Sequence, residues 1–371
     1  MRILTLNPGS STLKAALIVD GATAASETWP AADAVADDHA IQQALDRWGR
    51  PDAVAIRFVH GGSRPEPTPV DEDLIRQLDR LSPLAPLHQP LSIEAARLAR
   101  KSLPEVPVVA CFDTSFHSGL PQAAAQYALP REWTRQNRLR RYGFHGLSCS
   151  YAARRAEELL DVPQPRLVCC HIGSGVSVTA IRDGCSIDTS MGFTPLEGAV
   201  MATRSGSVDP GLLLHVLGTG EVDLAGLTDT LYHRSGLAGM TGTSGDMREV
   251  LAARDAGDPD AALAVAVFLH RLRREIGAVA MSLDQLDAVV FTGGVAEHQP
   301  LLIGEIINGL RVLGLHTDPA RLMATGDRTV SPPAAPVALL VLAAREDLEL
   351  AQQAERFLAG NVQRRTGWQP R

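Results

Sequence analysis

The stretch that most constrains the fold of this chain is residues 4–17, which read Leu-Thr-Leu-Asn-Pro-Gly-Ser-Ser-Thr-Leu-Lys-Ala-Ala-Leu. An apolar segment is interrupted by the Asn-Pro-Gly triplet at 7–9 and then resumes, which predicts two strands joined by a turn. Glycine and serine at the turn let backbone amides and the Ser10 hydroxyl approach an anion, and Lys14 adds a positive charge. An ordinary N-terminal hairpin with a solvated lysine is the alternative interpretation.

The same pattern recurs at residues 167–181, which read Leu-Val-Cys-Cys-His-Ile-Gly-Ser-Gly-Val-Ser-Val-Thr-Ala-Ile. Aligning Asn7 with His171 superimposes the two glycine-serine turns and places Ala16 on Ala180 in the second strand. The sequence therefore indicates that a strand, turn and strand unit occurs twice. Two unrelated hairpins are the alternative.

A later pair of strands extends the repeat. Residues 106–112 form a continuous apolar run that stops at Asp113, and we match it to residues 288–292, which stop at Gly293. We expect an α/β fold built from two duplicated units whose glycine-rich hairpins face each other across a cleft. Helices are predicted over residues 71–81, 92–102, 148–160, 261–283, 301–313 and 345–358.

Composition limits the size and the partners of this protein. The 371 residues are 45% hydrophobic and 21% charged, which is enough for two ordinary cores. The net charge of −7 lacks the basic excess that nonspecific binding to nucleic acid or to an anionic membrane requires. We therefore expect neither nucleic acid nor membrane as a partner.

The cysteines and the N-terminus favour a cytoplasmic protein. The five cysteines are an odd number and form no Cys-x-x-Cys pair, which suits buried thiols in a reducing compartment better than disulfides or zinc. The first apolar run is cut at Asn7, so it is too short for the hydrophobic region of a signal peptide.

The familiar phosphate-binding motifs are absent from the sequence, because neither Gly-x-x-x-x-Gly-Lys-Ser/Thr nor a Gly-x-Gly-x-x-Gly that opens a helix occurs. The hairpin turns would then hold phosphate. Asp113 follows a buried strand, where a carboxylate can orient a divalent metal or a nucleophile. Its alternative role is to cap the turn at Thr114.

Two arginines could bind a carboxylate or a phosphoryl group through a fork of N–H donors. Arg57 lies inside an apolar strand, where a buried structural ion pair is the competing interpretation. Arg204 lies in a loop rich in glycine and serine that has little core to support, which favours a ligand-facing role.

The histidines match no zinc spacing. His145, in the sequence Gly-Phe-His-Gly, is the one best suited to donate a hydrogen bond to a transferred phosphoryl group. Apolar residues adjoin these polar motifs, and each by itself is better explained as core than as pocket. They are Val59, Leu87, Phe144 and Pro195.

Eight motifs in order resemble the acetate kinase family over almost the whole chain. They are Asn7-Pro-Gly-Ser-Ser-Thr-Leu-Lys14, Arg57-Phe-Val-His-Gly-Gly62, Ala85-Pro-Leu-His88, Phe112-Asp-Thr-Ser-Phe-His117, Arg141-Tyr-Gly-Phe-His-Gly146, His171-Ile-Gly-Ser-Gly175, Asp188-Thr-Ser-Met-Gly-Phe-Thr-Pro-Leu-Glu-Gly198 and Thr203-Arg-Ser-Gly206. The resemblance implies membership of the superfamily of acetate and sugar kinases, heat-shock chaperones and actin. The implied fold has two duplicated ribonuclease H-like domains, residues 1–115 with 350–371 and residues 116–349, the second of which binds nucleotide.

The resemblance also implies an activity. Acetate kinases reversibly transfer the γ-phosphoryl group of ATP to acetate, giving acetyl phosphate and ADP, with Mg²⁺ or Mn²⁺, and a homodimer is expected. Propionate or butyrate is the close alternative substrate, because one methylene changes discrimination by only about 1 to 3 kcal/mol. A nonenzymatic nucleotide-binding switch is the distant alternative, although a switch needs no pair of carboxylate-binding arginines.

Residue by residue, the resemblance implies roles around the reaction. Arg57 and Arg204 would hold the acetate carboxylate and stabilise the phosphoryl group in transfer, and His145 would donate to the transition state. The metal ligands would be Asn7, Asp113 and Glu346. The phosphoryl path would be lined by Asn7, Ser10, Thr12 and Lys14, and the acetate methyl group by Val59, Leu87, Phe144 and Pro195.

The implied nucleotide site comes from three segments. It comprises His171, Ile172, Gly173, Ser174, Gly175, Asp246, Met247, Arg248, Gly293, Gly294, Val295, Ala296 and Glu297. The chain departs from the usual family pattern at Gln89 and Ser174, where asparagine is usual, and at Ala296 and His298, where glycine and asparagine are usual.

Overall fold

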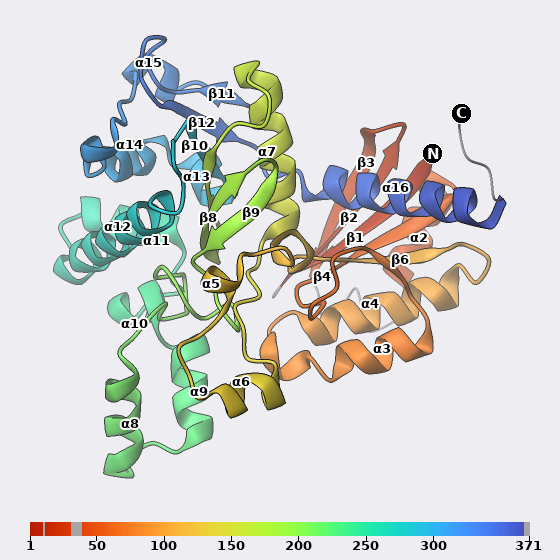
Figure 1. Cartoon of the computed structure of the whole chain (residues 1–371), viewed down its shortest axis with the longest axis horizontal. Helices are drawn as coiled ribbons and strands as arrows, with labels where there is room; N and C mark the ends of the chain where they lie inside the picture. Colours follow the sequence, from red (N-terminus) through yellow and green to blue (C-terminus); the bar gives the residue numbers. More distant parts are fainter. Residues whose placement is uncertain (10–11, 31–38, 367–371) are drawn as a thin grey trace. The chain divides into compact units, whose positions relative to one another are not determined.

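The computed structural model describes residues 1–9, 12–30 and 39–366, with side chains as far as residue 360. The predicted phosphate contact Ser10 lies outside the described residues. By their internal contacts, residues 1–119, 144–151 and 345–371 form unit 1, and residues 120–143 and 152–344 form unit 2. Each unit is built on a mixed six-stranded sheet (Figure 1).

The sheet of unit 1 has the strand order β3-β2-β1-β4-β6-β5. Strands β1, β4 and β6 are parallel, and β2, β3 and β5 pair antiparallel to their neighbours. The central strands are buried on both faces, as their unbroken runs of alanine, valine and isoleucine predict. The strand bounds are β1 Arg2–Pro8, β2 Thr12–Val19, β3 Ala22–Pro30, β4 Ala53–Phe58, β5 Thr68–Pro69 and β6 Val108–Phe112.

Helices cover both faces of this sheet, so unit 1 has two apolar cores. Val54 and Ile56 point to the face covered by α3 and α4, whereas Ala53 and Ala55 lie in the cluster that contains Leu350 of α16. The period of two along β4 produces this division. The helices of unit 1 are α2 His39–Trp48, η1 Ser82–Leu84, α3 Glu72–Asp79, α4 Gln89–Ser102, η2 Ser115–His117 and α16 Glu346–Thr366, and α7 Gly146–Leu160 starts here and ends in unit 2.

The sheet of unit 2 repeats the same topology, with the order β9-β8-β7-β10-β12-β11 when it is read from its hairpin edge. Strands β7, β10 and β12 are parallel, and the other three are antiparallel to their neighbours. The predicted duplicated α/β fold is therefore confirmed. The bounds are β7 Leu167–Ile172, β8 Val176–Arg182, β9 Cys185–Thr189, β10 Ala288–Thr292, β11 Arg328–Thr329 and β12 Ala338–Leu342.

The longest helix of unit 2, α12, packs on β7 and β8. Asp258 caps its N-terminus by accepting from the backbone N–H groups of Asp260 and Ala261, and Pro259 occupies the first turn. The helices are α5 Gln122–Ala125, α6 Arg131–Asn137, α8 Pro210–Thr219, α9 Leu224–His233, α10 Gly236–Thr241, α11 Met247–Asp255, α12 Pro259–Ala280, α13 Gly294–His298, α14 Pro300–Asn308, η3 Arg311–Leu313 and α15 Pro319–Leu322.

The structure corrects the predicted alignment of the two hairpins. Pro8 pairs with Leu13 across the first turn, but Ile172 pairs with Val176 across the second, so the second turn is one residue shorter. Strand β8 is therefore displaced by one position, and Ala16 corresponds to Thr179 rather than to Ala180. With this register the two sheets carry a bulge at the same place, after Leu17 in β2 and after Ala180 in β8.

The predicted correspondence between residues 106–112 and 288–292 is wrong. Strand β10 occupies the place of β4, and the strand that matches β6 is β12. By the registers within each sheet, Asp113, which follows β6 in unit 1, has Ala344, which follows β12 in unit 2, as its equivalent position. Both runs were apolar and ended at polar or glycine residues, so composition could not show which pair shared a position.

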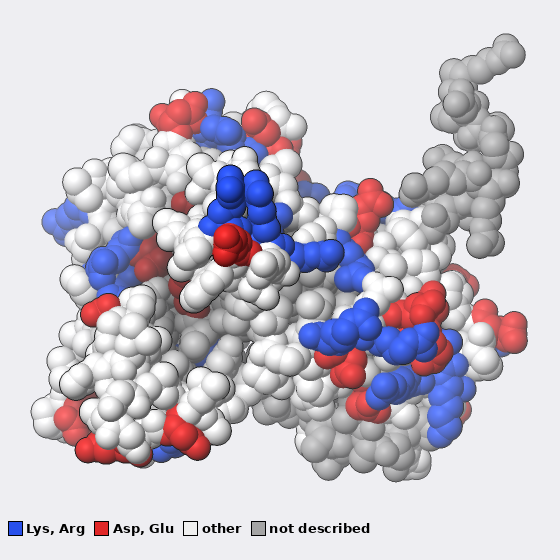
Figure 2. Space-filling view, turned by 60° about the horizontal axis from the view of Figure 1, so that its bottom comes forward, with Lys and Arg blue, Asp and Glu red and all other residues white. Residues whose placement is uncertain are grey.

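Surface charge is mixed. On the face drawn in Figure 2, lysine and arginine lie among aspartate and glutamate, without a broad surface of one sign. Within the described ranges, no helix is both long and apolar enough to cross a bilayer.

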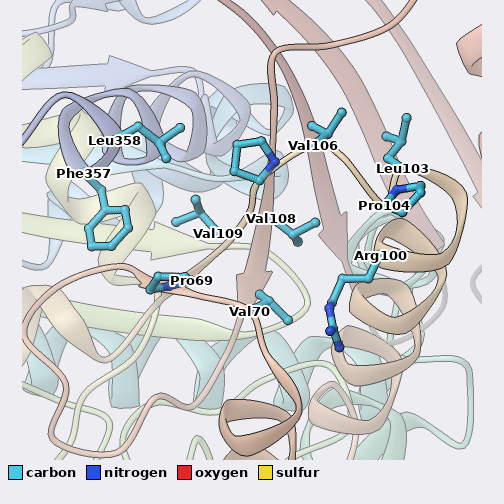
Figure 3. A pocket seen from close by; sticks show the side chains of 11 residues that line it. Pro69, Val70, Arg100, Leu103, Pro104, Val106, Val108, Val109, Phe357 and Leu358 are labelled. Atoms are coloured by element: carbon cyan, nitrogen blue, oxygen red, sulfur yellow. The ribbon is translucent and has the colours of Figure 1, made fainter. Parts of the chain in front are cut away.

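A cavity of about 540 Å³ lies beside β5, β6 and the end of α16 (Figure 3). Ten of its eleven lining residues have apolar side chains, Val70, Val108 and Phe357 among them. The guanidinium of Arg100 also lines it and is already paired with Glu72. This cavity lacks the convergent polar groups of a binding site, so we assign it no ligand.

Candidate active site

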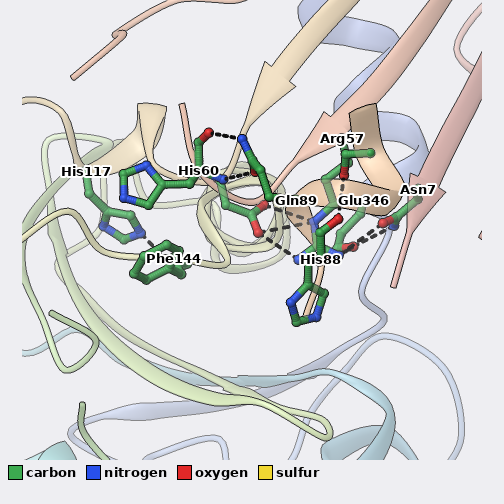
Figure 4. A network of polar contacts seen from close by, with 10 residues as sticks. Asn7, Arg57, His60, His88, Gln89, His117, Phe144 and Glu346 are labelled. Carbon is green, nitrogen blue, oxygen red and sulfur yellow. Dashed lines mark hydrogen bonds and ion pairs between the residues drawn. The ribbon is translucent and has the colours of Figure 1, made fainter. Parts of the chain in front are cut away.

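The polar cluster of unit 1 is centred on an ion pair between Arg57 and Asp113 (Figure 4). Arg57 Nη2 donates to Asp113 Oδ2 at 2.7 Å, and Nε lies 3.1 and 3.2 Å from the two carboxylate oxygens. The Asp113 side chain is fully buried, and the Arg57 side chain is 11% exposed. The sequence was consistent with either a structural ion pair or a ligand-binding role for Arg57. The structure shows the ion pair, and the third guanidinium nitrogen, Nη1, is not directed at Asp113.

That remaining nitrogen, Arg57 Nη1, connects two further predicted residues. It donates to Asn7 Oδ1 at 3.0 Å and lies 3.4 Å from Glu346 Oε2. Asn7 Nδ2 also donates to Glu346 Oε2 at 2.7 Å. One guanidinium therefore organises an amide and two carboxylates.

The topology explains why residues so distant in sequence meet. Asn7, Arg57 and Asp113 lie at or just beyond the carboxyl ends of the neighbouring parallel strands β1, β4 and β6. Ligands of open α/β sheets bind at this edge. Glu346 is the first residue of α16, where the helix N-terminus favours a negative charge.

His145 borders the same cluster. Its backbone has φ 56°, an uncommon value for a residue other than glycine, and its backbone N–H donates to the Asp113 carboxylate. A Cβ atom on Gly146 would lie 2.0 Å from the Asp113 carbonyl oxygen, so only glycine lets α7 start this close to β6. The Gly-Phe-His-Gly motif thus fixes His145 next to Asp113.

Charge and burial oppose each other in this cluster. Burial raises the pKa of Asp113 to about 6, although Arg57 lowers it, and the nearby Glu346 raises it further. Burial alone would lower the pKa of Arg57, but the charges of Asp113 and Glu346 raise it above its ordinary value. Arg57 is therefore a permanent cation held between two carboxyl groups.

The donor set fits a hard divalent cation. Asn7, Asp113 and Glu346 offer amide and carboxylate oxygens, which are the ligands that Mg²⁺ accepts, usually with several waters. In the described parts of the chain, no group of three or more His, Cys, Asp or Glu side chains is placed to hold a metal ion. The protein oxygen donors of the Arg57 cluster are therefore two carboxylates and one amide.

Three predicted apolar contacts lie in unit 1. Val59 and Phe144 are 3% and 1% exposed, and Leu87 is half-buried. Gln89 holds the backbone next to Val59, because its amide accepts from His60 N at 3.1 Å and donates to His60 O at 2.8 Å. Gln89, which stands where the family usually has asparagine, is therefore buried and holds the backbone of the segment that carries Val59 in place.

The buried His117 gives a stability prediction. Its Nε2 lies 3.0 Å from the Phe144 carbonyl oxygen, and burial lowers its pKa to about 4. The unfolded chain binds a proton near pH 6.5, so the folded state loses stability as the pH falls from about 6.5 to 4. We expect His117→Gln to remove about 3 kcal/mol of this pH dependence.

The measurement is urea unfolding at pH 7 and pH 4.5 for both proteins. Asp113 acts with the opposite sign because its pKa is raised, so the difference between the two proteins isolates His117. Parallel pH profiles for the two proteins would contradict the assignment.

Arg204 and Pro195 lie together in unit 2. Arg204 Nη1 donates to the Pro195 carbonyl oxygen at 2.7 Å, and Arg204 is only 5% exposed. Burial lowers the pKa of Arg204 to about 10. Among the described residues, Arg204 forms no ion pair with a carboxylate, unlike Arg57.

The three predicted nucleotide segments meet in one cavity of about 300 Å³ in unit 2. Leu237 and Phe268 add apolar walls that the sequence analysis missed, because they come from helices without any polar motif. His298, noted only as a departure, also lines the cavity. The predicted residues in its lining are Gly173, Ser174, Asp246, Met247, Arg248, Gly294 and Val295.

The other predicted nucleotide residues are placed differently. Ile172 and Ala296 are buried in the core of unit 2, and Glu297 Oε1 accepts from the backbone N–H of Ala344 at 3.0 Å. His171, Gly175 and Gly293 flank the cavity segments without lining the cavity. In unit 1, Thr12 and Lys14 lie in β2, and the Lys14 side chain is exposed.

Comparison with known proteins identifies the family. The profile of the acetokinase family matches residues 39–352. This chain belongs to the acetokinase family. An acetate kinase of Synechococcus sp. is 47% identical over 312 residues, covering 83% of this chain and 77% of that protein. An acetate kinase of Clavibacter michiganensis is 43% identical over 352 residues, covering 91% and 89%. The predicted family is therefore confirmed.

Solved structures agree with this assignment. A propionate kinase from Francisella tularensis has a TM-score of 0.87 at 32% identity, covering 95% of this chain and 98% of that one. An acetate kinase from Porphyromonas gingivalis has a TM-score of 0.85 at 30% identity, covering 96% and 99%. The fold of this chain is therefore shared with these two kinases over nearly its entire length.

Proposed function

We propose that this protein is an acetate kinase that reversibly transfers the γ-phosphoryl group of ATP to acetate, giving acetyl phosphate and ADP. The observation that carries the proposal is the Arg57 cluster, in which a permanent cation and oxygen donors meet at the carboxyl edge of a parallel sheet. Phosphoryl transfer needs positioning and charge stabilisation rather than covalent help from the protein. Membership of the acetokinase family supports this reaction over others at such an edge.

The reaction joins a carboxylate oxygen of acetate to the γ-phosphorus and breaks the bond from that phosphorus to the ADP oxygen. Arg57 and Arg204 bind the acetate carboxylate and the charge that develops on the phosphoryl oxygens. The imidazole of His145 donates a hydrogen bond to the same oxygens. Asn7, Ser10, Thr12 and Lys14 line the path of the phosphoryl group.

Mg²⁺ is the metal that we propose, and Mn²⁺ is the substitute. Asn7, Asp113 and Glu346 would hold it, directly or through water, because they supply the hard oxygen donors of the Arg57 cluster. When bound, the ion neutralises charge on the phosphate oxygens of ATP.

We propose that the nucleotide and the acyl group are bound by different residues. We propose that the cavity of unit 2 holds the nucleotide, with the backbone near Gly173 and Gly294 close to its phosphates. His171, Ile172, Gly175, Gly293, Ala296 and Glu297 support the segments that line it. The acetate methyl group contacts Val59, Leu87, Phe144 and Pro195.

Propionate is the second candidate substrate, because the solved relative with a TM-score of 0.87 is a propionate kinase. A hydroxylamine trap distinguishes the acids. The protein, ATP and Mg²⁺ are incubated with acetate, propionate or butyrate, and acyl phosphate is trapped as acyl hydroxamate. We expect the highest kcat/KM with acetate. A higher value with propionate would reassign the substrate, and no hydroxamate from any acid would refute a kinase for these acids.

We also propose a homodimer that forms through α8 and α9. Helix α8 has no buried residue in the structure, and Leu214 of α8 and Leu224, the first residue of α9, are 72% and 71% exposed. The lobe at lower left in Figure 2, where Figure 1 places these helices, is mostly uncharged. An exposed apolar surface of this kind favours association with an identical surface.

Sedimentation velocity tests the dimer. The 39.6 kDa chain should sediment as a particle of twice that mass, and Leu214→Glu should shift it to the monomer. Leu263→Glu, on the 57% exposed Leu263 of α12, is the matched control and should remain dimeric. A monomeric unmodified protein at micromolar concentration would contradict the proposal.

A cytoplasmic location is proposed from the thiols. None of the five cysteines, all of which lie among the described residues, forms a disulfide, and four of them are buried. Cysteines kept as thiols suit a reducing compartment.

A further inference from the structure

Unit 2 has a polar network of its own, formed by Tyr127, Arg141 and Glu197, which have no role in the reaction proposed above. Tyr127 Oη donates to Glu197 Oε2 at 2.5 Å, and Arg141 Nη2 donates to Glu197 Oε1 at 2.8 Å. The Arg141 guanidinium also stacks over the Tyr127 ring, 5.5 Å from its centroid. The three side chains form a closed triangle in which each contacts the other two.

This triangle holds the loop formed by residues 190–197. Phe193 N donates to Tyr127 Oη at 2.9 Å, and Arg141 Nη1 donates to the Ser190 carbonyl oxygen at 3.1 Å. Glu197, at the far end of the loop, is itself a member of the triangle. Both ends and the middle of the loop are therefore fixed by side chains from residues 127 and 141.

The close approach of the network requires glycine in the loop. A Cβ atom on Gly192 would lie 1.7 Å from Glu197 Oε2 and 2.1 Å from Tyr127 Oη. The backbone N–H of Tyr142 also donates to the Gly192 carbonyl oxygen at 2.9 Å. The contacts therefore depend on the path of the backbone through residue 192 and not only on the side chains.

The loop in turn holds Arg204. Its Pro195 carbonyl oxygen accepts the hydrogen bond from Arg204 Nη1, the one side-chain hydrogen bond of Arg204 among the described residues. Among the described residues, no carboxylate forms an ion pair with Arg204. Whatever sets the position of Pro195 therefore sets the direction of this guanidinium.

We propose that Tyr127, Arg141 and Glu197 are positioning residues that aim Arg204 and Pro195 at the acid substrate. The inference rests on the proposed function, because it assumes that Arg204 and Pro195 contact the acid. Burial and hydrogen bonding to Glu197 raise the pKa of Tyr127, so its hydroxyl remains a donor throughout the working pH range. The network therefore controls acid binding and acid selectivity, and the nucleotide cavity does not depend on it.

The test is steady-state kinetics of Tyr127→Phe and Glu197→Gln with acetate, propionate and ATP varied separately. Tyr127→Phe keeps the ring beneath Arg141 but loses both hydroxyl hydrogen bonds. We expect the KM for acetate to rise about tenfold and the ratio of propionate to acetate kcat/KM to change at least threefold, with the KM for ATP within twofold of the unmodified enzyme. Glu197→Gln keeps an acceptor for Tyr127 but loses the charge facing Arg141, so a smaller shift of the same kind is expected.

Glu305→Gln is the matched control. Glu305 is 37% exposed and paired with Arg254 in the same unit, and Glu197 is 35% exposed and paired with Arg141. The control should leave every kinetic constant unchanged. An acetate KM and selectivity within twofold of the unmodified enzyme in both test variants would overturn the inference, as would equal changes in the KM values for acetate and ATP. If the unmodified protein itself makes no acyl hydroxamate, the proposed function fails instead.

Discussion

We expect Arg204→Ala to lower kcat about 100- to 1000-fold without lowering the free energy of unfolding. The kinetic loss corresponds to about 2.7 to 4 kcal/mol, which is typical when one preorganised donor to a developing oxyanion is removed. Arg204 suits such a role because it is buried and is held by a single carbonyl oxygen of Pro195. Its remaining N–H donors are therefore available to the acid or the phosphoryl group.

The expected stability follows from the same environment. Burial lowers the pKa of Arg204 to about 10, which means that the folded protein disfavours this cation. No carboxylate within the described residues pairs with it, so alanine leaves no buried anion behind. A residue that reduces stability in order to serve function should give a variant at least as stable as the parent.

The measurement combines hydroxamate kinetics with thermal unfolding. Arg204→Lys is the informative companion, because it keeps the charge but loses the fork geometry, and we expect it to recover only part of the lost turnover. A kcat within tenfold of the parent for Arg204→Ala would show that the guanidinium does not face the reaction. A large fall in melting temperature would show that it is structural.

The sequence predicted the fold well where one local pattern occurred twice. The turn at Asn7 and its repeat at His171 were enough to infer a duplicated unit. The exact register was out of reach, since a turn shorter by one residue leaves the pattern of apolar strands unchanged while moving β8 by one position. The same limit explains why β10 was matched to β6, because buried parallel strands read alike.

The candidate site was predictable to the extent that its residues lie in short motifs. Arg57 and Asp113 could be identified because the first interrupts an apolar strand and the second follows one, whereas the roles of Asn7 and Glu346 came from the resemblance to the acetate kinase family. The contacts of Gln89 and Tyr127 could not, because an amide that clamps a backbone and a hydroxyl that pairs with a carboxylate are defined by tertiary contacts. The grouping of residues 144–151 with unit 1 likewise depends on long-range packing.

We expect Arg57→Gln to lower both the free energy of unfolding and the turnover. Asp113 is fully buried and depends on Arg57 for its ion pair and for three of its hydrogen-bond contacts. Removing one partner of a buried pair leaves an uncompensated charge and costs about 3 to 5 kcal/mol. Glu346 also loses its nearby cation. We expect a loss of this size in the unfolding free energy of unit 1, together with a fall in kcat of at least 100-fold.

Urea unfolding monitored by tryptophan fluorescence measures the stability term, because Trp29 and Trp48 pack against the core of unit 1. The control is Arg254→Gln, which breaks a more exposed ion pair with Glu305 and should cost no more than about 1 kcal/mol. In the double variant Arg57→Gln with Asp113→Asn, the buried group is neutral, so much of the lost stability should return while turnover stays low. Stability that falls equally in the single and double variants would refute the ion-pair explanation, and recovered turnover in the double variant would remove Arg57 from the reaction.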